Sequence, residues 1–207
     1  MVQNNNAIFF ADEKFCYFFY ASVIETLGES DFKDLLVSSG LNEFDFYRPT
    51  FKPISIFQLN VFINALLSKY GILSSQGICI LVGKAFFRNL RRERREVQEI
   101  GKIQRRLEQF SVRIYSGLID LTEILQAHMQ IPMRIIECSQ KWQVEFNDEV
   151  LTHLDVRISS LSYFLRGFFQ EYLEWMETDR HFKIEESLSE KSTQFKRGLE
   201  ISVIPLD

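Results

Sequence analysis

The stretch MRIIECSQKWQVEF, residues 133–146, decides the fold class. Met133 and Ile135, and then Trp142, Val144 and Phe146, alternate with polar neighbours, which is the spacing of β-strands with one buried face. Ser139-Gln140-Lys141 lies between the two runs and is typical of a hairpin turn. This segment therefore predicts two antiparallel strands.

On the C-terminal side, residues 161–176 (LSYFLRGFFQEYLEWM) follow Ser159 and Ser160, either of which can cap a helix. Strand spacing then returns twice, at residues 182–184 and at residues 199–203. The second half therefore predicts the order strand, strand, helix, strand, strand.

On the N-terminal side the apolar spacing is helical. Gly28 and Gly71 are placed to end two of the helices. Expected helices cover residues 15–27, 31–39, 56–70, a segment from Ser74 or Ser75 through Phe86, and residues 103–128. Helices that precede a run of strands indicate an α+β fold, with a helical N-terminal half packed on an antiparallel sheet of about four strands. Without a repeat or linker, residues 1–207 are expected to form a single domain.

The composition excludes several classes of protein. The formal net charge of −4 does not favour nucleic acid as a partner. The three cysteines are widely spaced, which favours a reducing compartment. Residues 1–6 do not have the order of a signal peptide, and charged residues interrupt the apolar stretches before a spanning length. The expected location is cytoplasmic.

No nucleotide-binding or catalytic motif occurs, so the chain is not expected to be an enzyme. His128, His153 and His181 are too far apart for a local metal motif, and no metal is expected. His128, near the end of a predicted helix, has two interpretations. A favourable contact with the helix dipole is favoured, and an axial ligand to a tetrapyrrole metal is the alternative.

The strongest charged feature is an arginine cluster made of Arg88, Arg91, Arg92, Arg94 and Arg95. Interleaved glutamates favour a solvated helix face. The alternative is a docking patch for an acidic partner, a ligand carboxylate or an anionic membrane surface.

The 20 phenylalanines favour either a ring-filled core or a pocket for a flat apolar ligand. The expected pocket lies between residues 103–128, the hairpin and the following helix. Its candidate ligand-binding residues are Cys138, Trp142, His128, Phe164 and Phe168. A closed core in the same place is the competing interpretation.

Several short motifs resemble the 4-vinyl reductase domain family. They are Leu173-Glu174-Trp175, the run from Phe182 to Glu186, Pro205-Leu206-Asp207, and upstream Lys69-Tyr70-Gly71 with Gly83-Lys84-Ala85-Phe86-Phe87. Cys138 falls where this family often has its first cysteine. The places where this family often has further cysteines hold Lys141, Ser162, Ser189 and Arg197. A thiolate metal site is therefore not expected.

The resemblance implies a fold shared with ligand-binding domains of nitric-oxide signalling and with Golgi-transport tethering subunits. It also implies a non-catalytic domain for an apolar molecule, with a tetrapyrrole pigment or precursor as the expected ligand. The expected role is assembly of photosynthetic complexes, whose membrane-protein intermediates would be partners at the periphery of an internal photosynthetic membrane. A ligand-free interaction scaffold and a subunit of tetrapyrrole reduction are the alternatives.

A homodimer is also expected. Related domains pair through their helices, and the apolar helix at residues 15–27 needs cover on more than one side.

Overall fold

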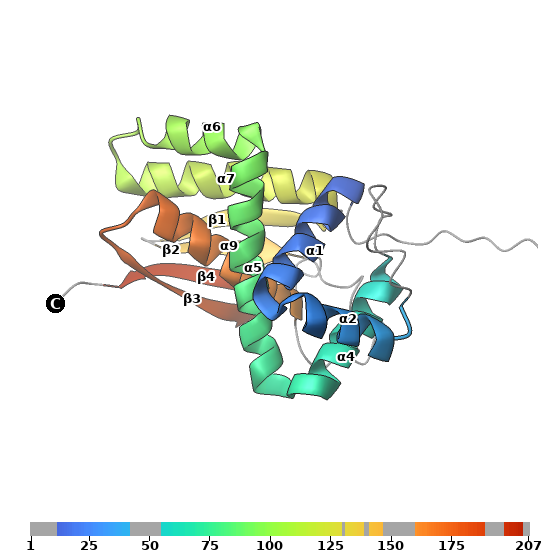
Figure 1. Cartoon of the computed structure of the whole chain (residues 1–207). Coiled ribbons are helices and arrows are strands. Elements are labelled where there is room, and N and C mark those ends of the chain that lie inside the picture. The colour runs from blue at the N-terminus through green and yellow to red at the C-terminus, as the bar shows by residue number, and fades with distance from the viewer. Residues whose placement is uncertain are drawn as a thin grey trace, which may run out of the picture.

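The computed structural model describes residues 12–41, 55–129, 131–138, 141–146, 160–188 and 197–204. Helices precede and flank an antiparallel sheet, which confirms the α+β prediction (Figure 1). The elements are α1 (Glu13–Leu27), α2 (Glu29–Ser38), α4 (Ile56–Tyr70), α5 (Ile72–Glu93), α6 (Arg95–Gln104), α7 (Phe110–Met129), β1 (Met133–Cys138), β2 (Lys141–Phe146), α9 (Ser160–Met176), β3 (His181–Leu188) and β4 (Arg197–Ile204).

The four-stranded sheet has the order β1-β2-β4-β3, and every neighbouring pair is antiparallel. Val144 faces Ile135 on β1 and Leu199 on β4, so apolar residues lie side by side across the strands. Trp142 likewise pairs with Ile201, and both are almost fully buried. Ser139 and Gln140 of the expected turn lie outside the described residues, and so does Pro205-Leu206-Asp207.

Helices α5 and α9 cross at a point where both lack side chains. A Cβ built on Gly83 would overlap the carbonyl oxygen of Phe164, and one built on Gly167 would overlap the carbonyl oxygen of Ile80. The two glycines therefore let the helix backbones touch. Figure 1 shows the consequence, with α5 running steeply across α9 and the sheet behind them.

Helix α1 packs on α5 and is covered largely by its own chain. Asp12 caps it, with a side-chain oxygen that accepts from the backbone N–H of Phe15 at 2.9 Å. Phe15, Phe18 and Val23 are buried, whereas Tyr17 is exposed. The argument that this helix needs a second copy of the chain for cover is therefore not supported at α1.

The predicted start of the helix at residues 103–128 is wrong. α6 ends at Gln104 and α7 begins only at Phe110, so the chain reverses between them. The Gln104 side chain donates to Ser116 and Asp120, which holds the two helices side by side. Leu107 keeps the helical spacing across the break, and the apolar pattern alone therefore conceals it.

Two other helices begin earlier than expected. Gly28 (φ 81°) ends α1 and directly precedes α2, which starts at Glu29 rather than Asp31. Gly71 (φ 76°) ends α4, and α5 starts at Ile72, ahead of Ser74 and Ser75. Ser75 lies inside α5, where its hydroxyl donates to the carbonyl of Leu66.

The stretch Gln58–Glu93 is, by length and hydropathy, the one candidate membrane span among the described residues. Its 18-residue window has a mean hydropathy of 1.4, and only 17% of that window is buried. Because Gly71 divides the stretch into α4 and α5, it is not one straight helix. Lys69 and Lys84 lie within the stretch, so no uncharged run in it reaches the roughly 20 residues of a spanning helix.

Candidate ligand cavity

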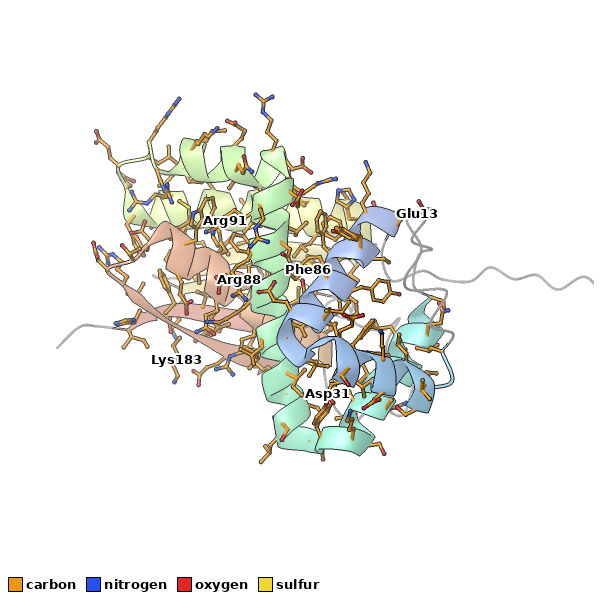
Figure 2. The ribbon with its side chains drawn as sticks, in the orientation of Figure 1. Glu13, Asp31, Phe86, Arg88, Arg91 and Lys183 are labelled. Atoms are coloured by element: carbon orange, nitrogen blue, oxygen red, sulfur yellow. The ribbon has the colours of Figure 1, made fainter. Side chains whose placement is uncertain are left out.

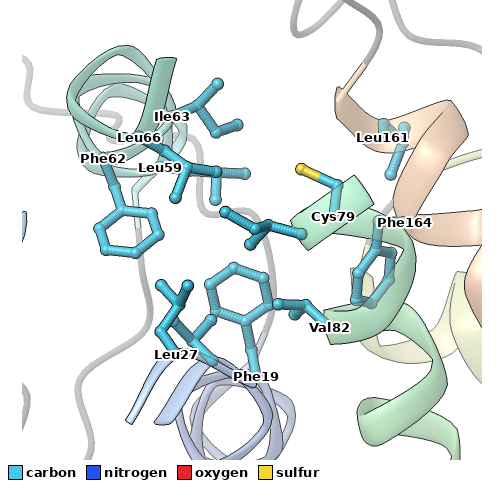
Figure 3. Close-up of a pocket in the computed structure, with 12 residues that line it drawn as sticks. Phe19, Leu27, Leu59, Phe62, Ile63, Leu66, Cys79, Val82, Leu161 and Phe164 are labelled. Atoms are coloured by element: carbon cyan, nitrogen blue, oxygen red, sulfur yellow. The ribbon is translucent and has the colours of Figure 1, made fainter. Parts of the chain in front are cut away.

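An apolar cavity lies where α1, α4, α5 and the start of α9 meet (Figure 3). Each helix contributes residues that recur mostly three or four apart and so lie on one side of that helix. The described lining residues are Phe19, Val23 and Leu27 of α1, Leu59, Phe62, Ile63 and Leu66 of α4, Ile78, Cys79 and Val82 of α5, and Leu161 and Phe164 of α9.

The cavity has a volume of about 50 Å³. No described lining residue is charged, and Cys79 supplies the one heteroatom of their side chains. Since a water molecule needs two to four polar partners, a cavity with this lining stays dry. Burial raises the pKa of Cys79 to about 12, so its sulfur is a neutral thiol at physiological pH.

The residues predicted for the pocket separate in the structure. Phe164 lines the cavity, and Phe168, one turn further along α9, packs edge-on against Phe87 and at a tilt against Phe86. Trp142 lies on β2, with its ring edge-on to Phe110 at 6.0 Å. Cys138 is exposed at the end of β1. The structure thus brings Phe164 alone of these residues to the cavity wall.

His128 lies near the end of α7 and has partners at both ring nitrogens. Nδ1 is 2.5 Å from an oxygen of Asp12, and Nε2 is 3.2 Å from Arg94. Because a guanidinium can only donate, Nε2 accepts, and Nδ1 therefore carries the ring proton and donates to Asp12. Neither nitrogen is free to bind a metal in this arrangement.

A row of stacked and edge-on rings connects His128 with the cavity. His128 stacks on Phe15 with ring centroids 4.3 Å apart, and Phe15 meets Phe86 edge-on at 5.4 Å. Phe86 in turn meets Phe164 at 5.2 Å. The phenylalanines between the two places thus pack against one another as part of the core.

The five arginines of the predicted docking patch have different partners. Arg88 pairs with Glu25 of α1 and Glu171 of α9, and Arg91 lies over the ring of Trp175 (Figure 2). The other three differ again. Arg94 binds His128 and Glu96, Arg95 is 3.9 Å from Glu99, and Arg92 is exposed.

The sequence reasoning missed the lining residues of α1 and α4. These helices are apolar on more than one side, which is the signal that could have indicated a second apolar surface. Among the residues that the structure describes, no group of three or more His, Cys, Asp or Glu is arranged to hold a metal ion. His153 lies outside them.

The comparisons with known proteins give likeness in structure alone. No family model matches the sequence, and no curated protein does. Similar solved structures include an H-NOX protein from S. oneidensis in the Fe(II) ligation state, with 11% identity, a TM-score of 0.62, and coverage of 92% of this chain and 97% of that chain.

Two other solved structures are also similar at low sequence identity. The Fe(II) unliganded H-NOX protein from K. algicida has 8% identity, a TM-score of 0.61, and coverage of 94% and 97%. An oxygen-binding H-NOX domain related to soluble guanylate cyclases has 13% identity, a TM-score of 0.55, and coverage of 94% and 95%. At these identities the likeness shows a common fold.

The resemblance to the 4-vinyl reductase family is therefore corrected. The similar structures are H-NOX proteins, and no family model supports the earlier assignment. In the structure Leu173-Glu174-Trp175 lies at the end of α9, and the run from Phe182 to Glu186 lies in β3. The expected roles in chlorophyll chemistry and photosystem assembly depended on this assignment and are no longer supported.

Proposed function

We propose that this chain is a non-catalytic domain that binds a small apolar molecule in the cavity between α1, α4, α5 and α9. One observation carries the proposal, which is a cavity between four helices whose described lining is entirely apolar apart from a neutral thiol. Such a site attracts a ligand through dispersion contacts and offers nothing to a charged or strongly polar one.

The volume sets the size of the ligand. A cavity of about 150 Å³ in another protein takes benzene, and the cavity here has about 50 Å³. It therefore suits a molecule of a few heavy atoms, in the range of a dissolved gas or a very short hydrocarbon. The similarity to an oxygen-binding H-NOX domain supports a ligand of this class.

The geometry at His128 supports a binding role rather than catalysis. An Asp–His pair activates a nucleophile only when the second ring nitrogen faces a hydroxyl or thiol. Here that nitrogen accepts from Arg94. The pair Asp12–His128 instead joins the start of α1 to the end of α7, where the N–H of Asp12 also donates to the carbonyl of His128.

A tetrapyrrole is the second candidate, because one similar structure concerns haem redox potential and porphyrin distortion. The described residues do not fit it. Sites for larger ligands have about 300–1,000 Å³, and cysteine ligates haem iron as thiolate, whereas Cys79 keeps its proton. Binding would require α1 and α4 to move away from α5 and α9.

The test measures melting temperature and ligand absorption. Cyclopropane should raise the melting temperature because it stabilises the folded state, by about 2.7 kcal/mol at a hundred times its dissociation constant. Benzene should raise it less, since it exceeds the cavity. Hemin should give no stoichiometric complex with a sharp absorption band. A tight hemin complex, or a cyclopropane response no greater than that of benzene, would overturn the proposal.

A matched pair of variants locates the site. Cys79→Leu fills the cavity and should abolish the cyclopropane response. Cys138→Leu makes the same change at an exposed position and should leave the response intact. If Cys79→Leu does not fold, Cys79→Val makes the smaller version of this change.

A further inference from the structure

Helix α5 exposes an apolar stripe that no element of the described chain covers. Leu73 is 81% exposed, Leu81 is 54% exposed, and Gly77 lies exposed between them. The four-residue spacing places all three on one side of the helix. Counted at about 100° per residue, Gly77 at the centre of the stripe lies about 100° around the helix from Ile78 and about 140° from Val82, both of which line the cavity. The stripe occupies the first turns of α5, at the lower edge of Figure 1.

The two glycines of α5 differ in what surrounds them. Gly83 is explained by α9, whose backbone occupies the space that a side chain would need. At Gly77 an added Cβ would have no described atom within 4 Å other than its neighbours in α5 itself. A glycine in a helix costs roughly 0.5–1 kcal/mol relative to alanine. Nothing that the structure describes within this chain offsets that cost at Gly77.

The stripe is also neutral. Residues 70–83 contain no charged side chain. The lysines at either end have partners, since Lys69 pairs with Asp31 and Lys84 with Glu174. The surface thus offers no charge that would attract an acidic partner or an anionic membrane. It also offers no charge that would repel a second copy of itself.

We propose that the stripe is the contact between two copies of this chain, with the two α5 helices antiparallel about a two-fold axis at Gly77. In that arrangement a residue four positions before Gly77 faces the residue four positions after it in the other copy. Leu73 of one copy therefore meets Leu81 of the other, twice. The surface is self-complementary, as a two-fold interface requires.

Glycine at the axis permits close approach of the two backbones, which α5 already achieves with α9 through Gly83 and Gly167. A stripe of about three helical turns is small against the roughly 1,200–2,000 Å² of a stable interface. The dimer is therefore reversible, with a dissociation constant in the micromolar range. It differs from the pairing through residues 15–27, because α1 is covered within the chain.

The first test is sedimentation equilibrium from about 1 µM to about 500 µM, a range that brackets a micromolar dissociation constant. The full chain should shift from monomer to dimer, and Leu81→Glu should hold it monomeric. Val37→Glu places the same charge at another exposed apolar residue, 73% exposed on α2, and should leave the dimer intact. A monomer at every concentration, or a dimer that Leu81→Glu does not weaken, would refute the interface.

The second test fixes the geometry by disulfide formation in a Cys138→Ser background. Gly77→Cys should cross-link to itself, because both copies meet at the axis. Leu73→Cys alone should not, since the two positions would lie about 12 Å apart, beyond the roughly 7 Å limit of a disulfide. The double variant Leu73→Cys, Leu81→Cys should cross-link. Self-linking of Leu73→Cys as the main product would exclude the antiparallel arrangement.

A membrane surface could bind the apolar stripe in place of a second copy, and a separate experiment tests this alternative. Flotation with neutral phosphatidylcholine vesicles should leave the chain in the protein fraction. Flotation that Leu81→Glu abolishes, together with a monomer in solution, would replace the dimer by a lipid contact.

Discussion

At the scale of single residues, Cys79 is the most informative side chain of the cavity. Burial raises its pKa to about 12, so the reactive thiolate is a very small fraction of the thiol near neutral pH. Below pH 12 each unit of pH should increase that fraction, and the alkylation rate of Cys79, about tenfold.

Mass spectrometry after timed iodoacetamide treatment measures the rate at each cysteine. Cys138 is exposed and should react first. Cys79 should react slowly at pH 8 and faster as the pH rises while the fold persists. Equal rates at Cys79 and Cys138 at pH 8 would contradict a thiol that is shielded in the cavity wall.

Asp12 gives a prediction for acid stability. Partial burial alone would raise its pKa, but the hydrogen bonds from Phe15 N–H and from His128 outweigh burial and lower the pKa. A carboxyl whose folded pKa is lowered stabilises the fold above its unfolded pKa of about 3.9, and this contribution is lost as pH falls through the folded value.

Asp12→Asn removes the charge and keeps a good helix cap, whereas Asp12→Ala also removes the cap, at a cost of about 1 kcal/mol. Urea unfolding of the three proteins between pH 6 and pH 2 measures both effects. The advantage of the wild type over Asp12→Asn should shrink towards pH 2. An advantage that is independent of pH would mean that the Asp12 charge contributes nothing.

The site residues show why residue types alone misled the sequence analysis. Trp142, Cys138 and His128 were chosen because their chemistry is distinctive, yet each has a structural position outside the cavity. The actual lining is made of leucine, valine, isoleucine and phenylalanine. In the sequence, residues that line a cavity cannot be told from residues that pack in a closed core. The cavity depends on how the four helices pack against one another and not on any one residue.

At the scale of elements, the crossing of α5 and α9 makes a strong prediction. Gly83→Ala or Gly167→Ala would drive a methyl group into a backbone carbonyl. Overpacking of this kind costs about 1–3 kcal/mol, which lowers the melting temperature by about 2–4 °C per kcal/mol in a chain of this size.

Gly77→Ala is the matched control on the same helix, because its methyl group would meet no described atom beyond its neighbours in α5. Measured at a concentration where the chain is monomeric, it should be neutral or stabilising by up to about 1 kcal/mol. Thermal melts of the three variants check both statements. Equal effects at Gly77 and Gly83 would mean that the glycines act through helix propensity alone.

The elements themselves were largely predictable from the sequence. Alternation in β1 to β4 and helical spacing in α9 gave strands and helix in the right order, because burial on one face dictates the period. The break between α6 and α7 was not predictable from spacing. It depends on contacts such as that of Gln104 with Asp120, which join residues far apart in the chain.

At the scale of the whole molecule, the fold is that of H-NOX proteins and the interior is largely closed. The rings between His128 and Phe164 pack against one another, which leaves the cavity at the other end of the row as the described space for a ligand. The sequence alone could not show whether this chain shares a ligand site with proteins of the same fold, because fold does not determine the chemistry of a site.

The most direct test of ligand binding in this cavity is methyl NMR of the protein under dissolved xenon, an apolar probe that occupies dry cavities. The account predicts saturable shifts confined to methyl groups that line the cavity, such as those of Leu59, Leu66 and Val82, and their loss in Cys79→Leu but not in Cys138→Leu. Shifts centred on Trp142 and α7, or no saturable shift at any cavity methyl group, would contradict it.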